Sequence, residues 1–221
     1  MEYLSYLNDL FEKNKNDDYA PKMSKYMRNQ FQFYGINSPQ RTKILQQFLQ
    51  ENGLPKPEKL SEILAIMWEK PQREWQYAAL YIFQKIIKKS KNDFLELAES
   101  LIIQKSWWDT IDTIAPTIVG EILLYLPEKK EEYTEKWALS DNFWLKRTSI
   151  IFQLHYKSKT NTDLLEKYIL LNIESKEFFI QKAIGWALRQ YARIDKEFVK
   201  NFVKKNENLS SLSKREALKH I

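Results

Sequence analysis

The chain has 221 residues, of which 43% are hydrophobic and 29% charged, a composition typical of a globular protein that can bury a sizeable core. It has no cysteine and two histidines, which excludes disulfides, thiolate nucleophiles and Cys-ligated metals and argues against Ser-His-Asp catalysis and His-rich metal sites. None of its four glycines lies in a Gly-rich phosphate-binding motif, so the sequence predicts no metal and no cofactor.

The sequence contains no membrane-spanning segment that we can identify. No segment approaches the run of roughly 18 apolar residues that a span needs, and the N-terminal region is polar and acidic. We therefore expect a cytoplasmic protein without a membrane partner. No heptad repeat or long unpaired apolar helix indicates an interface with a second chain, so we expect a monomer.

Scarce glycine, few paired turn residues and no sustained period-2 alternation predict helices joined by short connections. Helix starts are marked at Ser38-Pro39, as N-cap and first-turn proline, and by capping-box patterns at Thr160 to Asp163 and Ser213 to Glu216. In chain order, the predicted helices after the N-terminal region are 39–52, 58–69, 72–90, 92–105, 116–126, 129–139, 141–156, 161–174, 176–192 and 195–206.

These helices follow one another as pairs, which is the pattern of stacked helical hairpins. The sequence therefore predicts an all-α fold, an α-solenoid or superhelix of HEAT-like (armadillo-like) repeats with irregular spacing. No stretch is long enough to be a linker, so we expect a single domain over residues 1–221.

Two indoles and two carboxylates fall within the segment Ser106 to Asp112. On a helix, positions i and i+4 are neighbours, so Trp108 and Asp112 present an aromatic plane beside a carboxylate. That pairing suits a cationic substrate, because both groups attract positive charge. Two structural alternatives remain at this point: the tryptophan pair is core packing, and Asp109 or Asp112 is a helix cap.

Charge is uneven along the chain. Residues 1–140 carry 19 Lys and Arg against 20 Asp and Glu, whereas residues 141–221 carry 16 against 9. The basic part is therefore C-terminal, which favours a polyanionic partner such as nucleic acid, with an incidental charged face as the alternative.

The basic part also contains tryptophans beside cations. In the predicted helix from Ser175 to Tyr191, Trp186 lies on one stripe with Lys182 and Arg189. Arg147 follows Trp144 by one turn, and for Trp144 we prefer packing between repeats. Lys214 and Arg215 are expected in the first turn of a capped helix, where a phosphate is also favoured. The opposite stripe of the 175–191 helix is predicted to enter the core and consists of Ile180, Ala183, Ile184, Ala187 and Leu188.

Five segments together resemble the AlkD-type DNA alkylation repair glycosylases, collinearly over nearly the whole chain. They are MSKYMRNQFQFYGINSPQR at 23–41, SWWDTIDTIAP at 106–116, DNFWLKR at 141–147, SKEFFIQKAIGWALRQY at 175–191 and LSKREALKH at 212–220. The resemblance implies a HEAT-like superhelix that clasps duplex DNA in a basic groove. It also implies excision of positively charged N3- and N7-alkylated purines, without a deep pocket for the extruded base.

The same resemblance assigns roles to residues. It places Asp112, Trp108 and Trp186 at the catalytic positions and matches Arg147 to an arginine that holds the DNA backbone near the lesion. The resemblance implies that five further residues face DNA, namely Tyr26, Ser38, Arg189, Lys214 and Arg215. We add Lys182, because it lies on the same stripe as Trp186.

A cationic alkylpurine leaves as a neutral base, so its excision needs one carboxylate rather than the usual acid and base pair of glycoside hydrolysis. The sequence thus favours a DNA glycosylase with duplex DNA containing alkylated bases as its partner. Two alternatives keep the architecture without the chemistry: a module that binds damaged or branched nucleic acid, and a HEAT-like scaffold for protein partners. Weak salt dependence of binding would mark the scaffold, because phosphate contacts make affinity fall steeply with salt.

Overall fold

The computed structural model describes residues 2–221, with side chains from Tyr3 onward, and over this range it contains helices and no β-strand. This confirms the predicted all-α fold. The chain forms two compact units, one ending at Asn92 and the other spanning Asp93–Ile221. Within the described residues no helix is long and apolar enough to cross a membrane.

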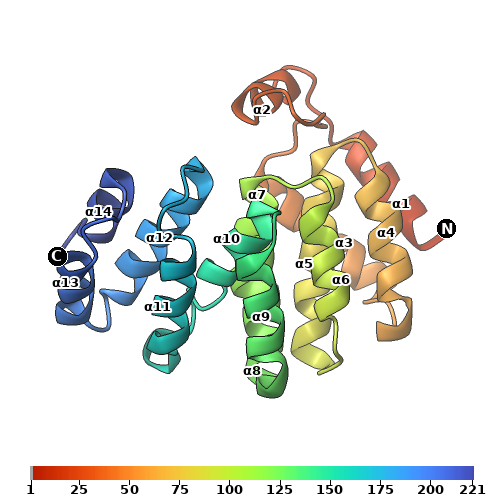
Figure 1. Cartoon of the computed structure of the whole chain (residues 1–221). Helices are drawn as coiled ribbons and strands as arrows, with labels where there is room; N and C mark the ends of the chain where they lie inside the picture. The colour runs from red at the N-terminus through yellow and green to blue at the C-terminus, as the bar shows by residue number, and fades with distance from the viewer. Residues whose placement is uncertain (1) are drawn as a thin grey trace. The chain divides into compact units, whose positions relative to one another are not determined.

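The first unit consists of packed helices, with a loop between α2 and α3 (Figure 1). Helix α4 packs against α5, while α3 packs against both α1 and α5. Its core is aromatic, with Phe11 in edge contact with Trp75 at a centroid distance of 5.1 Å. The elements are α1 (Glu2–Lys13), α2 (Ala20–Tyr26), α3 (Ser38–Asn52), the 3-10 turn η1 (Pro57–Lys59), α4 (Leu60–Glu69) and α5 (Arg73–Lys89).

A buried carboxylate ties the loop before α3 to this core. Glu74, in the first turn of α5, is fully buried and accepts backbone N–H bonds from Tyr34, Gly35 and Ile36 at 3.0 to 3.1 Å. Burial raises the pKa of Glu74, and these backbone donors act in the opposite direction. Gly35 has φ +84, and a Cβ there would lie 2.2 Å from the carbonyl oxygen of Asn16, so the loop requires glycine at this position.

We expect Glu74→Gln to destabilise the protein by about 2 kcal/mol, because an amide nitrogen then faces a backbone donor and the charge-assisted bonds are lost. Urea denaturation followed by circular dichroism measures the change. The matched control is Glu69→Gln, an exposed glutamate close by on α4, for which the midpoint should stay within error. Equal midpoints for the two variants would contradict a structural role for the Glu74 carboxylate.

The second unit stacks helical hairpins after a longer, broken helix (Figure 1). Helices α9 and α10 pack together and α11 contacts both, while α13 contacts α12 and α14. Contacts between α10 and α12 and between α12 and α14 join the hairpins. This stacking is the helical-repeat arrangement that the sequence predicts. The elements are α6 (Leu95–Ile103), α7 (Trp108–Thr113), the π-helical turn η2 (Ile114–Val119), α8 (Gly120–Tyr125), η3 (Pro127–Lys129), α9 (Lys130–Leu139), α10 (Phe143–Ile151), η4 (Lys157–Lys159), α11 (Thr162–Leu171), α12 (Phe178–Tyr191), α13 (Lys196–Lys205) and α14 (Ser211–Ala217).

One predicted helix differs from the structure in a way that matters for function. The expected helix 116–126 is the end of a continuous helical stretch over 108–125, which widens into a π-helical turn at Ile114–Val119. Pro116 lies in that turn, and since proline lacks an N–H it cannot complete the regular hydrogen-bond ladder. π-turns of this kind occur frequently at functional sites.

Candidate functional site

Helix α7 presents a tryptophan and a carboxylate one turn apart. Its N-cap, Trp107, has extended backbone, so the helix begins at Trp108 and reaches Asp112 one turn later, directly before the π-turn. Trp108 and Asp112 are both half-buried. Trp107 caps the helix without a side-chain hydrogen bond, and Asp112 is directed to another helix, so the helix-cap interpretation is wrong for Asp112.

The partner of Asp112 is Arg147, in the second turn of α10. Arg147 donates from Nε to Oδ1 at 2.9 Å and from Nη2 to Oδ2 at 3.0 Å, which makes a bidentate pair. Its remaining terminal nitrogen, Nη1, donates to the backbone carbonyl of Phe179 in α12. The side chain of Arg147 is 5% exposed and that of Asp112 is 23% exposed, so the guanidinium is internal while the carboxylate still reaches the surface.

Opposing effects act on the Asp112 carboxyl group. Burial raises its pKa above the ordinary aspartate value, and the negative charge of Asp109 acts in the same direction. The charge and hydrogen bonds of Arg147 lower the pKa and thus oppose burial. Arg147 therefore keeps an otherwise desolvated carboxyl group closer to its ionised form.

An indole completes this group of side chains. Trp186, in the middle of α12, is half-buried, and its ring centroid lies 6.0 Å from the guanidinium carbon of Arg147. The structure thus brings Asp112, Arg147 and Trp186 together from three separate helices, with Trp108 one helical turn from the carboxylate. We call these four residues the Asp112 site.

Aromatic side chains at the starts of α10 and α12 support the Asp112 site. The ring of Phe179, whose carbonyl binds Arg147, lies 4.9 Å from the Trp144 ring and 5.4 Å from the Trp107 ring. Trp144 is 6% exposed, which confirms its interpretation as a packing residue between repeats. The indole N–H of Trp107 is buried and has no hydrogen-bond partner. This packing fixes the carbonyl that orients the arginine.

The two cations predicted beside Trp186 share one carboxylate. Glu216 of α14 pairs with Lys182 at 3.0 Å and also with Arg189, and its side chain is 15% exposed. These contacts lower the pKa of Glu216, with the Lys182 hydrogen bond as the largest cause. Lys182 and Arg189 do lie on the Trp186 side of α12, but Glu216 already neutralises part of their charge.

Helix α14 begins earlier than the sequence pattern predicts. Its N-cap is Ser210, which accepts from the backbone N–H of Ser213, and Ser213 lies inside the helix and donates to the carbonyl of Gln181. The predicted box at Ser213 to Glu216 is therefore wrong. Lys214 and Arg215 fall in the last turn of a seven-residue helix rather than in its first turn.

Gly185 allows α14 to approach α12. A Cβ at this position would lie 2.4 Å from Cβ of Glu216 and 3.0 Å from the carbonyl oxygen of Ser213. We expect Gly185→Ala to destabilise the protein by about 1 to 2 kcal/mol, because overpacking outweighs the usual gain of alanine in a helix. Thermal unfolding measures the effect. An unchanged or raised melting temperature would show that α14 moves away from α12 at no cost.

The remaining predicted residues, Tyr26 and Ser38, belong to the first unit. Both line a hollow of about 450 Å³ there, together with Lys22, Arg41 and Tyr77. Tyr26 is 71% exposed, and Ser38 is exposed at the start of α3. These two residues are thus near each other in a hollow that mixes aromatic rings with cations.

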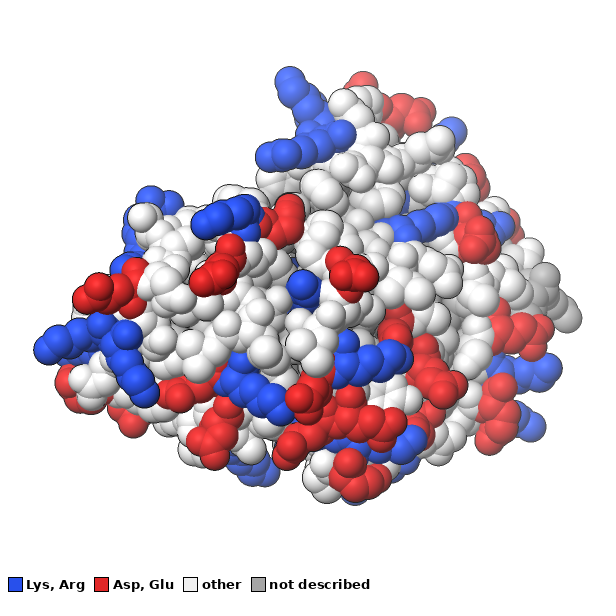
Figure 2. All heavy atoms as spheres, viewed as in Figure 1, with Lys and Arg blue, Asp and Glu red and all other residues white. Residues whose placement is uncertain are grey.

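Acidic and basic side chains are interspersed over much of the face shown in Figure 2. Acidic side chains are most numerous at the lower edge, and basic side chains project at the end formed by α13 and α14, next to acidic ones. This agrees with the basic C-terminal part that residues 141–221 predict.

Sequence reasoning missed two residues of this region. Glu216 had been assigned to a capping box, which hid its role as the shared partner of Lys182 and Arg189. Phe179 acts through a backbone carbonyl, a feature that no side-chain pattern reveals, although the adjacent pair Phe178-Phe179 at a helix start was a visible signal.

Comparison with known proteins assigns the family. A solved structure described as a predicted DNA alkylation repair enzyme from Enterococcus faecalis is similar to this chain, with 34% sequence identity and a TM-score of 0.85 over 94% of this chain and 96% of that one. No curated protein matches the sequence. The family model for DNA alkylation repair enzymes matches residues 7–221. The chain therefore belongs to the DNA alkylation repair enzyme family, as the resemblance of its segments predicts.

Proposed function

We propose that this protein is a DNA glycosylase that hydrolyses the N-glycosidic bond of positively charged N3- and N7-alkylated purines in duplex DNA. The observation that carries the proposal is the partly exposed Asp112 carboxylate, held on two oxygens by the internal Arg147, whose guanidinium lies 6.0 Å from the Trp186 ring. A fixed anion next to an indole face is suited to a reaction in which positive charge passes from a base to a sugar.

Alkylation at N3 or N7 gives the purine a positive charge, which makes it a good leaving group. The bond between C1′ of deoxyribose and the purine nitrogen breaks, and its electron pair goes to the base, which departs neutral. The positive charge then resides on the sugar as an oxocarbenium ion. Because the leaving group needs no proton, the reaction does not need the second carboxyl group that glycoside hydrolysis usually employs.

Asp112 supplies the negative charge for that step. Its carboxylate stabilises the oxocarbenium ion as it forms and then accepts a proton from the water whose oxygen bonds to C1′. Arg147 holds both oxygens in place and favours the ionised form, so little reorganisation is needed when charge develops. The products are a free alkylpurine and an abasic strand.

The indoles of Trp108 and Trp186 recognise the cationic nucleotide. Each offers a π face, and a cation over such a face gains about 0.5 to 2 kcal/mol. A partly open site of this kind contacts the charged lesion at the protein surface and does not enclose the base in a deep pocket.

Phosphates are held by the basic side chains of α12 and α14. Lys182 and Arg189 face the same side as Trp186, where a phosphate competes with Glu216 for them, and Lys214 and Arg215 extend the positive surface. In the first unit, Tyr26 and Ser38 line a hollow with two cations that suits the DNA backbone. Arg147 is internal, so in this proposal its part is to hold Asp112, and its match to a contact with the DNA backbone stays a prediction.

The test is release of free base from a duplex with one 7-methylguanine, under single-turnover conditions with excess protein. We expect chromatography to show free 7-methylguanine and alkali to cleave the resulting abasic strand. Two control duplexes define the chemistry: one carries ordinary guanine, and one carries uracil, a neutral base that needs help to leave. Neither should lose its base.

Other results would point elsewhere. Tight, salt-sensitive binding to duplex DNA without base release would identify a binding module and refute the glycosylase. Binding that does not depend on salt would refute phosphate recognition as well, since each neutralised phosphate adds about 0.9 to the slope of log affinity against log salt. Release of uracil at the same rate would refute selection by charge.

A further inference from the structure

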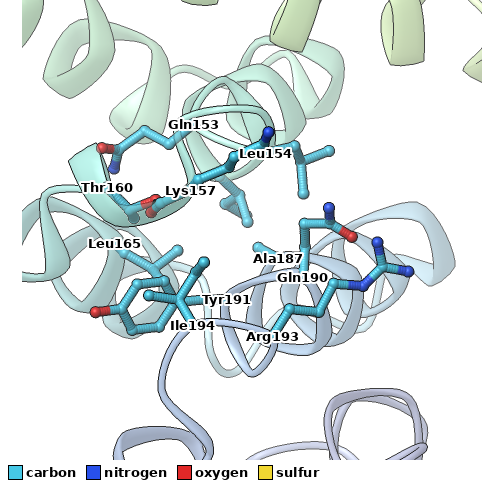
Figure 3. A pocket seen from close by; sticks show the side chains of 11 residues that line it. Gln153, Leu154, Lys157, Thr160, Leu165, Ala187, Gln190, Tyr191, Arg193 and Ile194 are labelled. Carbon is cyan, nitrogen blue, oxygen red and sulfur yellow. Dashed lines mark hydrogen bonds between the residues drawn. The ribbon is translucent and has the colours of Figure 1, made fainter.

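A second hollow lies in the same unit as the Asp112 site, between the segment 150–165 and the C-terminal end of α12 (Figure 3). Its volume is about 170 Å³, slightly more than the roughly 150 Å³ of an apolar cavity that takes one benzene ring. The hollow is therefore large enough for one five- or six-membered ring. Its apolar surface is formed by Ile150, Leu154, Leu165, Ala187 and Ile194.

Six polar side chains also line this hollow, namely those of Gln153, Thr160, Tyr191, Lys157, Gln190 and Arg193. Gln153 and Thr160 bond to the backbone. In the described part of the chain Lys157, Gln190 and Arg193 have no side-chain hydrogen bond or ion pair, in contrast to Lys182 and Arg189 on the same surface. Two cations and an amide that line an apolar hollow without internal partners favour a ligand that combines a ring with an anionic group.

The backbone at Lys157 adds an independent observation. Lys157 has φ +55, in the left-handed region that a residue with a long side chain seldom adopts. This conformation lies at the start of the turn that leads from α10 to α11. Such departures cost of order 1 to 3 kcal/mol and are common where a segment contacts a ligand.

The hollow continues the seam between α10 and α12 that begins at the Asp112 site. Gln190 follows Trp186 by four residues and therefore lies on the same side of α12 as Trp186, about 6 Å further along the helix axis. Arg193 lies just beyond the end of α12 and lines the hollow from the turn that follows the helix. On α10, Ile150 follows Arg147 by three residues in the same direction.

We propose that this hollow is a second nucleotide subsite, in which Lys157 and Arg193 hold a phosphate and the apolar surface takes the ring attached to it. Gln190 donates or accepts a hydrogen bond at the edge of that ring. The shared chemistry is a deoxynucleotide, either one in the damaged strand beside the lesion or a free mononucleotide. The first source rests on the proposed function, whereas the second does not.

The absence of cysteine makes a sharp test possible. Arg193→Cys or Lys157→Cys places a single thiol at the hollow, and duplexes with an abasic analogue and a thiol tether on successive phosphates can then form a disulfide with it. We expect the yield to peak at one phosphate, one to three nucleotides from the lesion. Lys159→Cys is the matched control, because it is exposed on the same turn but does not line the hollow, and its yield should show no preferred position.

A second measurement addresses affinity. The double variant with Lys157→Ala and Arg193→Ala should bind duplex DNA about tenfold more weakly at low salt, and its salt slope should be shallower by about 0.9, the contribution of the one phosphate that the two side chains hold. The control with Lys159→Ala and Lys196→Ala, both exposed, should change less. The test for a free mononucleotide is titration with thymidine monophosphate, in which the NMR signal of the Gln190 side-chain amide is followed.

Each result has a definite meaning. A preferred cross-link position with a shallower slope supports the subsite and identifies the strand as its source. A shift of the Gln190 amide with thymidine monophosphate, abolished in the double variant, supports the subsite for free nucleotides. If neither effect is observed, the subsite is overturned. Base release by the parent protein is measured separately. Cross-linking at a preferred position without base release refutes the glycosylase but not the subsite. Base release with neither a preferred cross-link position nor a Gln190 shift refutes the subsite but not the glycosylase.

Discussion

Replacing Asp112 by Asn is expected to slow release of 7-methylguanine from duplex DNA by about a hundredfold to a thousandfold, the usual cost of removing an electrostatic stabiliser. The amide keeps the shape of the side chain but has no charge for the oxocarbenium ion. It also turns an N–H group toward Arg147, where the carboxylate accepted two bonds. Single-turnover rates at neutral pH, with circular dichroism to verify folding, measure the effect.

Asp109→Asn is the matched control for this variant. Asp109 lies on the same helix, and its charge raises the pKa of Asp112. Removing that charge leaves Asp112 more readily ionised, so the rate at neutral pH should stay within a few-fold of the parent. Affinity for duplex DNA should be similar for both variants. Excision by Asp112→Asn at the parental rate would remove this carboxylate from the mechanism.

The helices were predictable because their apolar residues repeat with a helical period. In α12 the five residues of the predicted core stripe are all buried, since the period of 3.6 places them on one side. Trp186 and Arg189, on the polar stripe, are half-buried as expected of a surface that meets another group. Local periodicity is thus sufficient to decide which side of a helix faces the core.

Helix starts were less predictable, in a consistent way. The sequence suggested Ser38 and Thr160 as caps, but in both cases the N-cap is the adjacent Asn37 or Asn161, whose side chain accepts a backbone N–H. Asn, Asp, Ser and Thr cap helices with similar free energies, so adjacent polar residues compete within a few tenths of a kcal/mol. Tertiary packing then selects one of them.

The pairing of charges at the site could not be read from the sequence. Asp112 and Arg147 are 35 residues apart, and their contact exists only because α7 and α10 pack together. The resemblance assigned Arg147 to the DNA backbone, and that role stays a prediction beside the observed one of holding Asp112. The link from Arg189 to Glu216 spans 27 residues and depends on the glycine at which α12 and α14 approach each other.

Arg147→Met tests whether the arginine acts through Asp112. We expect base release at neutral pH to fall at least tenfold, because burial and Asp109 then raise the pKa of Asp112 without the opposing charge and hydrogen bonds of Arg147. The active form is the carboxylate, which is lost as pH falls through its pKa. A higher pKa therefore moves the acidic limb of the rate profile to higher pH, and raising the pH should restore much of the rate.

The pH profile of the rate is measured as single-turnover base release between about pH 5 and about pH 9, corrected for spontaneous loss of base. At low protein concentration the profile reports the pKa of Asp112 in the free protein, and at saturating concentration it reports the pKa in the complex. Arg189→Met is the matched control: it removes a guanidinium from the same surface, and should weaken DNA binding without moving the limb. The fold should also lose about 2 to 3 kcal/mol in Arg147→Met, less than a fully buried pair costs because Asp112 is 23% exposed. A lower rate with an unmoved limb would mean that Arg147 contributes through DNA contacts or packing, and that Asp112 is ionised without it.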